Sequence, residues 1–216
     1  MITAIIPTRK GSTRLPHKNV AMFEGETLLV RKVRQLLECT MIDRVVVFSD
    51  CQDWLTMAAH AGAHETNLLP PALTGNHSSF SDLIAHCAGT VGGDVAAWTP
   101  CTAPLAGPMI YDEALIQWLD SRECYDSLVT VVPERRFIMK NGKPMNYIPG
   151  PMHANSQNLP PLHVWSGALW AASTDDMVRW RYFHGDTPMI YEIPKRCGVD
   201  IDDHLDMAQA VAWSQL

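Results

Sequence analysis

Short apolar runs alternate along the chain with stretches in which apolar residues recur every three or four positions. The runs are rich in β-branched residues and predict buried strands at 3–7, 44–49, 95–98, 127–132, 168–172 and 189–193. The helical spacing predicts helices at 28–37, 53–61, 79–88, 108–119, 174–183 and 205–216. Strands that alternate with helices in this way are typical of α/β proteins. We therefore expect a three-layer, Rossmann-like fold whose mostly parallel sheet has helices on both faces.

The segment 133–162 interrupts this alternation. Asn141-Gly142 stands between two short runs and predicts a hairpin on a type I′ turn. Prolines then become too frequent for long regular elements, at Pro144, Pro149, Pro151, Pro160 and Pro161. We expect a single domain over 1–216 from which 133–162 leaves as an inserted arm, either a dimerisation element or a lid.

Composition and charge exclude several classes of protein. Hydrophobic residues make up 47% and charged residues 19%, as in ordinary globular domains. The net charge of −6 argues against a nucleic-acid partner, and no apolar run reaches the roughly 18 residues that a membrane span needs. Six cysteines without metal-site spacing, and a start on an apolar strand rather than a leader, favour reduced thiols and a cytoplasmic location.

A basic loop follows the first predicted strand, where parallel sheets bind ligands. Its cations and small polar residues are Arg9, Lys10, Gly11, Ser12, Arg14 and Lys18. Fixed positive charge, hydroxyl donors and a backbone that allows close approach are what a polyphosphate requires. The Walker pattern is absent. The loop therefore favours a polyphosphate site, and the alternative is a solvated basic loop.

Two carboxylates, Asp200 and Asp202, stand near the last predicted helix. Carboxylates at i and i+2 of an extended segment face the same side and can share one hard cation. Mg²⁺ held by one or two carboxylates together with substrate phosphates is usual in phosphoryl-transfer sites. The alternative is that Asp202 or Asp203 caps the helix.

A proline-bracketed turn at 98–105 follows another predicted strand, so Thr99 and Thr102 are candidates to line the same site. Cys101 has no assignable histidine partner, which favours an inert thiol over a nucleophile. We assign the seven tryptophans to packing in the core and the arm.

Three stretches, in this order, resemble the acylneuraminate cytidylyltransferases, which make CMP-sialic acid and related CMP-sugars. Ile5-Ile-Pro-Thr-Arg-Lys-Gly-Ser-Thr-Arg-Leu-Pro-His-Lys-Asn19 is similar to the nucleotide loop of that family. Cys101-Thr-Ala-Pro-Leu105 resembles its P-T-S-P-L turn, and Gly198-Val-Asp-Ile-Asp-Asp-His-Leu-Asp206 resembles its closing D-I-D-x-x-x-D motif. The resemblance covers essentially the whole chain and implies a nucleotidyltransferase fold and a homodimer.

The resemblance also implies a reaction and its site. The anomeric hydroxyl of a 2-keto acid sugar, a sialic acid-like nonulosonate, would attack the α-phosphate of CTP and release pyrophosphate. The catalytic residues would be Arg9, Lys18 and Asp202, and Asp200 with Asp202 would bind Mg²⁺. The nucleotide would be bound by Thr8, Arg9, Gly11, Ser12, Lys18, Asn19, Ser79 and Thr102. The sugar would be bound by Thr102, Gln157 and Ser166.

Four positions depart from the pattern of that family. Leu69 and Ala106 stand where the family has arginines, Ser156 replaces a basic residue, and Ser166 replaces the asparagine of N-G-A. These changes remove cations that would bind the substrates, so the resemblance does not fix which nucleotide and which sugar are used. The motif at 11–16 also resembles 3-deoxy-manno-octulosonate (KDO) cytidylyltransferases. A KDO-like sugar nucleotidyltransferase and a non-catalytic nucleotide-binding protein are the alternatives.

Overall fold

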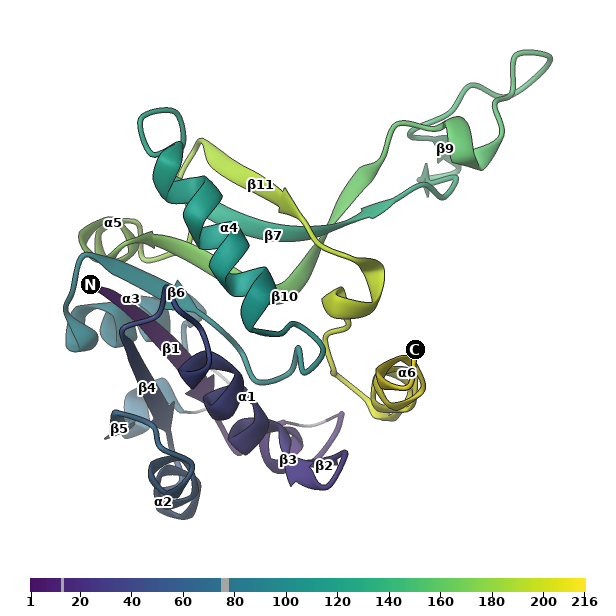
Figure 1. Ribbon diagram of the computed structural model, residues 1–216. Helices are drawn as coiled ribbons and strands as arrows, with labels where there is room; N and C mark the ends of the chain where they lie inside the picture. Colours follow the sequence, from purple (N-terminus) through teal and green to yellow (C-terminus); the bar gives the residue numbers. More distant parts are fainter. Residues whose placement is uncertain (13, 75–77) are drawn as a thin grey trace.

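The computed structural model describes residues 1–12, 14–74 and 78–216, and a seven-stranded sheet runs through their centre (Figure 1). The strand order is β11-β7-β10-β6-β1-β4-β5. The strands are β1 (Ile2–Thr8), β4 (Arg44–Ser49), β5 (Glu65–Leu68), β6 (Val95–Trp98), β7 (Ser127–Glu134), β10 (Leu162–Ser173) and β11 (Pro188–Glu192). Every neighbouring pair is parallel except the two pairs that include β10. The predicted mostly parallel sheet is confirmed.

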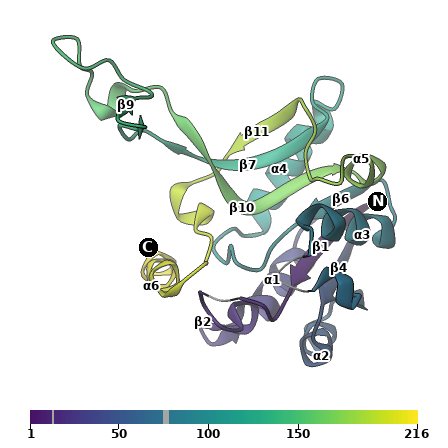
Figure 2. The same cartoon turned by 180° about the vertical axis from the view of Figure 1, so that it is seen from behind.

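Helices cover both faces of the sheet (Figures 1 and 2). They are α1 (Leu28–Leu37), α2 (Gln52–His60), α3 (Phe80–Val91), α4 (Pro108–Asp120), α5 (Thr174–Trp180) and α6 (His204–Ser214). The apolar sides of α1, α2 and α4 belong to one core cluster, which Ala210 of α6 joins. Residues of α3 and α5 belong to a second cluster. Along the described ranges no helix is both long and apolar enough to cross a membrane.

The helix starts follow from local capping. Thr27, Ser79 and Ser173 each accept a hydrogen bond from a backbone amide in the first turn of the following helix. At the other end the prediction for α5 was too long. The helix ends at Trp180 rather than at 183, because Arg181 adopts a left-handed conformation with φ 55°.

The sequence pattern missed two kinds of strand. β5 is an edge strand with the polar sequence Glu-Thr-Asn-Leu, so no apolar run marks it. The hairpin of β2 (Met22–Phe23) and β3 (Glu26–Thr27) is too short to show a period. β10 was predicted at 168–172 but begins at Leu162, because its first half pairs with the end of β7 outside the core.

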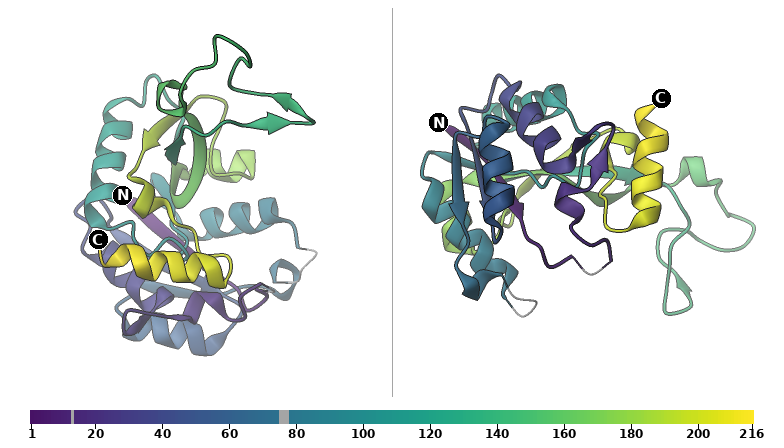
Figure 3. Two further views of the ribbon diagram at one scale, coloured as in Figure 1. Left: turned by 90° about the vertical axis from the view of Figure 1, so that its right-hand side faces the viewer. Right: turned by 90° about the horizontal axis from the view of Figure 1, so that it is seen from below.

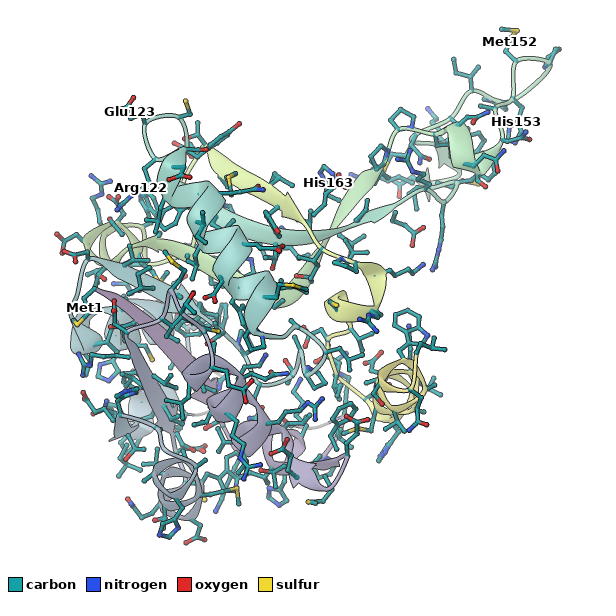
Figure 4. The ribbon with its side chains drawn as sticks, viewed as in Figure 1. Met1, Arg122, Glu123, Met152, His153 and His163 are labelled. Atoms are coloured by element: carbon teal, nitrogen blue, oxygen red, sulfur yellow. The ribbon has the colours of Figure 1, made fainter. Side chains whose placement is uncertain are left out.

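The extended ends of β7 and β10 carry the predicted arm away from the sheet and helices, as both views of Figure 3 show. Its hairpin joins β8 (Met139–Lys140) to β9 (Lys143–Pro144). Asn141 and Gly142 have φ values of 52° and 75°, as a type I′ turn requires. Figure 4 places Met152 and His153 at the far end of the arm, well away from the core. The His153 ring stacks on Phe137 within the arm.

Candidate active site

A cavity of about 550 Å³ opens beside the carboxyl ends of β1 and β6, where Pro7 and Trp98 lie. This is the edge at which parallel sheets bind ligands. The predicted site residues that line the cavity are Arg9, Gly11, Ser12, Lys18, Asn19, Thr102, Asp200 and Asp202. The fold therefore brings the basic loop, the turn after β6 and the carboxylate pair into one cavity.

Asp202 forms ion pairs with two cations of the basic loop. Lys18 Nζ donates to Asp202 Oδ1 at 2.6 Å, and Arg14 donates to Asp202 Oδ2 at 2.5 Å. Burial would raise the pKa of Asp202, but the hydrogen bonds and charges of Lys18 and Arg14 outweigh it and lower that pKa below its ordinary value. The carboxylate thus stays ionised at neutral pH.

Hydrogen bonds hold the basic loop in place at several points. The buried Asn19 side chain donates from Nδ2 to the Arg9 carbonyl at 3.1 Å, and the Cys101 thiol donates to Asn19 Oδ1 at 3.2 Å. The Lys10 amide donates to Asp50 Oδ1 at 2.9 Å. These hydrogen bonds connect the loop to Cys101 in the turn after β6 and to Asp50 after β4. They hold Arg9 and Lys18 at the cavity.

Asp200 opens into the same cavity but sits against the backbone of β10. A Cβ atom at Gly167 would lie 2.6 Å from Asp200 Oδ2, so only glycine permits this approach. The amide of Ile201 donates to the carbonyl of Thr102 at 2.8 Å, which fixes the segment beside the turn after β6. Burial raises the pKa of Asp200, while a hydrogen bond from the Thr102 hydroxyl and the charge of Lys18 partly offset the rise.

The neighbouring acids cap the last helix. Asp203 is the N-cap residue of α6 and forms a capping box with Asp206. Asp206 Oδ2 also accepts from the amide of Asp202 at 2.9 Å. The capping alternative is confirmed for Asp203, while the side chains of Asp200 and Asp202 remain directed to the cavity.

The carboxylates at the cavity are too few to bind a hard cation alone, so such an ion would also need oxygen atoms from a bound ligand. In the part of the chain that the structure describes, no group of three or more histidine, cysteine or acidic side chains could hold a metal ion. Asp200 and Asp202 supply two carboxylates at one cavity. Mg²⁺ is commonly bound by one or two carboxylates together with phosphate oxygens and water. The residues present fit that kind of site.

Four predicted site residues lie outside the cavity. The buried Thr8 hydroxyl donates to the Phe48 carbonyl inside the sheet, and Ser79 caps α3. Ser166 is buried and exchanges hydrogen bonds with Thr130. Gln157 is exposed in the arm. The tertiary structure, which a linear motif does not encode, places these four side chains in strands, at a helix cap and in the arm, away from the cavity. Thr13 of the same motif lies outside the described residues.

The two positions that lack the arginines of the family pattern are part of the core. Leu69 is 3% exposed and packs in the cluster on the α3 side, whereas Ala106 is fully buried in the cluster on the α4 side. Neither side chain lines the cavity. Cys101 is also fully buried, which raises the pKa of its thiol to about 12 and supports the prediction of an inert thiol.

Sequence reasoning missed an aromatic part of the cavity lining. It consists of Phe80, Trp98, Trp165, Trp170 and Phe183, which we call the aromatic wall. The sequence analysis assigns the seven tryptophans to core and arm packing, and Trp98 is indeed nearly buried, but Trp98, Trp165 and Trp170 also line the cavity. One sequence feature could have indicated that Trp98 lines the cavity: it ends β6, directly before the turn that is predicted to belong to the site.

Comparison with known proteins gives the class of this fold and site. Residues 3–141 match the family model described as cytidylyltransferase. The chain therefore belongs to the cytidylyltransferase family.

Individual relatives divide between two kinds of cytidylyltransferase. The chain is 34% identical over 129 residues to 3-deoxy-manno-octulosonate cytidylyltransferase of Chlorobaculum tepidum, which covers 60% of this chain and 50% of the relative. It is 26% identical over 220 residues to N-acylneuraminate cytidylyltransferase of Escherichia coli O18:K1:H7, which covers 99% of this chain and 52% of the relative. The chain thus spans about half the length of these curated relatives.

Solved structures agree on the fold. CMP:2-keto-3-deoxy-manno-octonic acid synthetase complexed with CTP superposes with a TM-score of 0.70 at 15% identity, covering 100% of this chain and 99% of the other. A 4-diphosphocytidyl-2C-methyl-D-erythritol synthase from Anaerococcus prevotii gives a TM-score of 0.67 at 10% identity, covering 100% and 98%. At these identities the likeness shows the nucleotidyltransferase fold alone.

Proposed function

We propose that this chain transfers CMP from CTP to the anomeric hydroxyl of a 2-keto acid sugar and releases pyrophosphate. The observation that carries the proposal is the meeting of Arg9 and Lys18 with Asp200 and Asp202 at one cavity. Nucleotidyl transfer depends mainly on positioning and on neutralising phosphate charge. Cations and carboxylates that face one cavity provide both requirements.

Each residue has a part in this proposal. Arg9 and Lys18 neutralise the triphosphate, the backbone at Gly11 lets it approach, and the Ser12 hydroxyl donates to it. The sugar oxygen forms a bond to the α-phosphorus as the bond to the β-phosphate oxygen breaks. Pyrophosphate leaves with that electron pair, and the hydroxyl proton passes to water. No covalent enzyme intermediate is needed, which agrees with the inert Cys101.

Without a bound nucleotide, Asp202 neutralises the two cations Lys18 and Arg14. A bound triphosphate carries more negative charge than one carboxylate, so Lys18 and Arg14 would exchange Asp202 for phosphate oxygens. Asp202 would then be available, with Asp200, to hold Mg²⁺, which supplies further charge neutralisation at the phosphates. Nucleotide and metal ion would consequently bind with positive cooperativity.

The acid sugar is sialic acid-like in our proposal, because the match to the N-acylneuraminate enzyme runs along 99% of the chain. The second candidate sugar is 3-deoxy-manno-octulosonate. It is favoured by the higher identity to the enzymes for that sugar, which reaches 34% over 60% of the chain for the Chlorobaculum tepidum relative. Both candidates share the carboxylate and the anomeric hydroxyl that the reaction uses.

The direct test is pyrophosphate release with Mg²⁺, each of the four ribonucleoside triphosphates and both acid sugars. We expect release only with CTP and an acid sugar together, and its loss when EDTA removes the metal ion. If no pair of substrates yields pyrophosphate, the chain is not a cytidylyltransferase in function, and a non-catalytic nucleotide-binding role takes its place.

Removing one loop cation tests the assigned roles. Lys18→Ala should lower kcat/KM on the order of 100-fold, because a charge that stabilises the transferring phosphate is gone. Lys10→Ala is the matched control, since Lys10 is an exposed cation of the same loop that does not line the cavity. Equal activity of the two variants would show that Lys18 has no part in the reaction.

A further inference from the structure

Three side chains of α1 hold the backbone of the turn after β6. Arg31 Nε and Gln35 Nε2 both donate to the Pro104 carbonyl, at 3.1 and 2.8 Å. Lys32 Nζ donates to the Ala103 carbonyl at 2.9 Å. The three positions lie within roughly 100° of one another around the helix axis, so they reach the same stretch of the turn. We call Arg31, Lys32 and Gln35 the α1 clamp.

Two members of the clamp oppose stability. Lys32 is fully buried, and among the described residues no carboxylate pairs with it. Gln35 Oε1 is buried and accepts no hydrogen bond within the described ranges, and the amide cannot be reversed because this oxygen would then face the Pro104 carbonyl. A buried cation and a buried oxygen without a donor both lower the free energy of unfolding relative to apolar side chains of similar volume. Such residues are typical of functional sites, which indicates a role for the clamp beyond folding.

The turn joins the clamp to the carboxylate side of the large cavity. Thr102 directly precedes Ala103 and lines that cavity, and its hydroxyl donates to Asp200. The Thr102 carbonyl also accepts from the Ile201 amide at 2.8 Å. A shift of the Ala103 and Pro104 carbonyls would therefore move Thr102, and Asp200 with it.

The clamp does not reach the cavity itself. Among the described residues that line the large cavity there is no member of the clamp. Arg31 and Gln35 instead line a separate cavity of about 260 Å³ beside Pro104 and Leu105. Any effect of the clamp on a reaction in the large cavity must consequently pass through the turn.

We propose that the α1 clamp is a set of positioning residues for nucleotidyl transfer. It holds the turn after β6 so that Thr102 keeps Asp200 in the arrangement that the reaction needs. This inference rests on the proposed function, because Asp200 belongs to the site proposed for that reaction. The rival explanation is that the clamp only stabilises the fold, and the test separates the two.

The test uses the two residues that share the Pro104 carbonyl. Each of Arg31→Met and Gln35→Met leaves this buried carbonyl one donor, whereas the double variant leaves it none. We expect kcat for pyrophosphate release to fall by no more than about threefold in each single variant. It should fall on the order of 20-fold in the double variant, because a buried carbonyl without a donor drives the turn out of place.

Arg34→Met is the matched control for these variants. Arg34 is also an arginine of α1 and also pairs with Glu26, at 3.2 Å against 3.6 Å for Arg31. Of the two arginines, only Arg31 donates to Pro104 within the described residues. Arg34→Met should keep the kcat of the wild type. A loss in this control equal to that of the double variant would trace the effect to the helix or to Glu26 and overturn the proposal.

Lys32→Met tests the third member of the clamp. The Ala103 carbonyl loses the donor at 2.9 Å, so kcat should fall on the order of fivefold. An unchanged kcat would remove Lys32 from the clamp and contradict the proposal for this residue.

Thermal unfolding separates positioning from a purely structural role. Gln35→Met removes one hydrogen bond but also a buried oxygen without a donor, so its Tm should stay within about 2 °C of the wild type. The double variant should remain folded at the assay temperature. If its loss of activity equals the fraction of unfolded protein at that temperature, the clamp is only structural and the proposal is overturned.

A binding measurement tests the placement of Asp200 without turnover. Calorimetric titration gives the Kd of CTP with EDTA and with Mg²⁺. The Kd with EDTA should be equal in the wild type and the double variant, since the cations of the basic loop are unchanged. The gain in affinity that Mg²⁺ adds should be at least about threefold smaller in the double variant, because a displaced Asp200 holds the ion less well. Equal gains in the two proteins would overturn the inference.

The outcomes distinguish this inference from the proposed function. If pyrophosphate is released and the double variant reacts like the wild type, the inference fails and the function stands. If no pair of substrates reacts, the function fails, and the two titrations alone decide whether the clamp positions Asp200.

Discussion

Lys32 is a fully buried lysine without a carboxylate partner among the described residues. Its Nζ donates to the Ala103 carbonyl at 2.9 Å, contacts the hydroxyl of Tyr111, and lies 4.8 Å from the centroid of that ring. It thereby fastens α1 to the turn that carries Thr102. Burial lowers the pKa of Lys32 from 10.5 to about 7, with a small opposing effect from Cys101.

This burial predicts a specific pH dependence of stability. Between about pH 7 and pH 10 the unfolded chain binds a proton at Lys32 that the folded chain does not. The free energy of unfolding therefore gains up to about 1.4 kcal/mol per pH unit from this group as the pH rises, and nothing below pH 7. In Lys32→Met this gain is absent. Urea unfolding of both proteins at pH 6, 7, 8 and 9 measures the difference.

The groups that face Lys32 do not confuse this measurement. Burial raises the pKa of Cys39 and of Cys101 to about 12 and that of Tyr111 well above its ordinary value, so all three stay neutral in the folded protein throughout the window. Their ionisation in the unfolded chain is common to the wild type and Lys32→Met and cancels in the difference between the two proteins. Stability curves that run parallel in the wild type and in Lys32→Met would contradict a depressed pKa for Lys32.

At the scale of the element, the bulge of β10 links the fold to the site. Gly167 has φ 65° and lies against Asp200. Gly167→Ala should therefore displace Asp200 and lower kcat at least tenfold, besides a loss of stability of about 1 kcal/mol from the strained φ. Gly142→Ala in the arm is the matched control, with φ 75° and no atom within 4 Å of the added Cβ. Pyrophosphate release and thermal unfolding are measured for both.

The two glycine variants should lose similar stability but differ in activity. If Gly167→Ala kept full activity, the close approach to Asp200 would have no role in the site. Gly167 lies in the bulge of β10 and Gly142 in the hairpin turn of the arm, and both have a positive φ. The two variants therefore differ in location rather than in backbone conformation.

The sequence predicted those parts of the molecule that periodicity and short motifs encode. The prediction of a strand over 95–98 is confirmed, and the structure brings Lys18 of the basic loop to one cavity with Asp200 and Asp202, as the motifs predict. Ser166 was assigned to the sugar, yet hydrogen bonds to Thr130 keep it in the sheet. The aromatic wall was missed because its rings converge only through strand order and the turn after α5.

At the scale of the whole molecule, the arm carries apolar side chains that do not pack against the core. Its exposed apolar side chains include Met139, Met145, Ile148 and Met152, with Ile148 72% and Met152 82% exposed. Apolar groups gathered outside a core are typical of surfaces that another chain covers. The homodimer that the resemblance implies therefore remains our prediction, with the arm as the contact.

Charged residues on the arm should abolish that dimer. Ile148→Asp together with Met152→Asp is expected to give a monomer in light scattering at concentrations where the wild type is dimeric, because two buried charges would face the interface. Met109→Asp is the control, since Met109 is 70% exposed in the first turn of α4, where an acid suits the helix. A wild type that is monomeric would refute the prediction outright.

The ion pair of Lys18 with Asp202 joins positions 184 residues apart. During synthesis the cationic loop leaves the ribosome long before the acid that neutralises it, so the nascent chain carries an uncompensated basic segment until residue 202 has emerged. Contacts of such separation form late and slowly. The site that we propose for a nucleotide and its metal ion is therefore completed only after residue 202 has emerged, when all seven strands of the sheet have been synthesised.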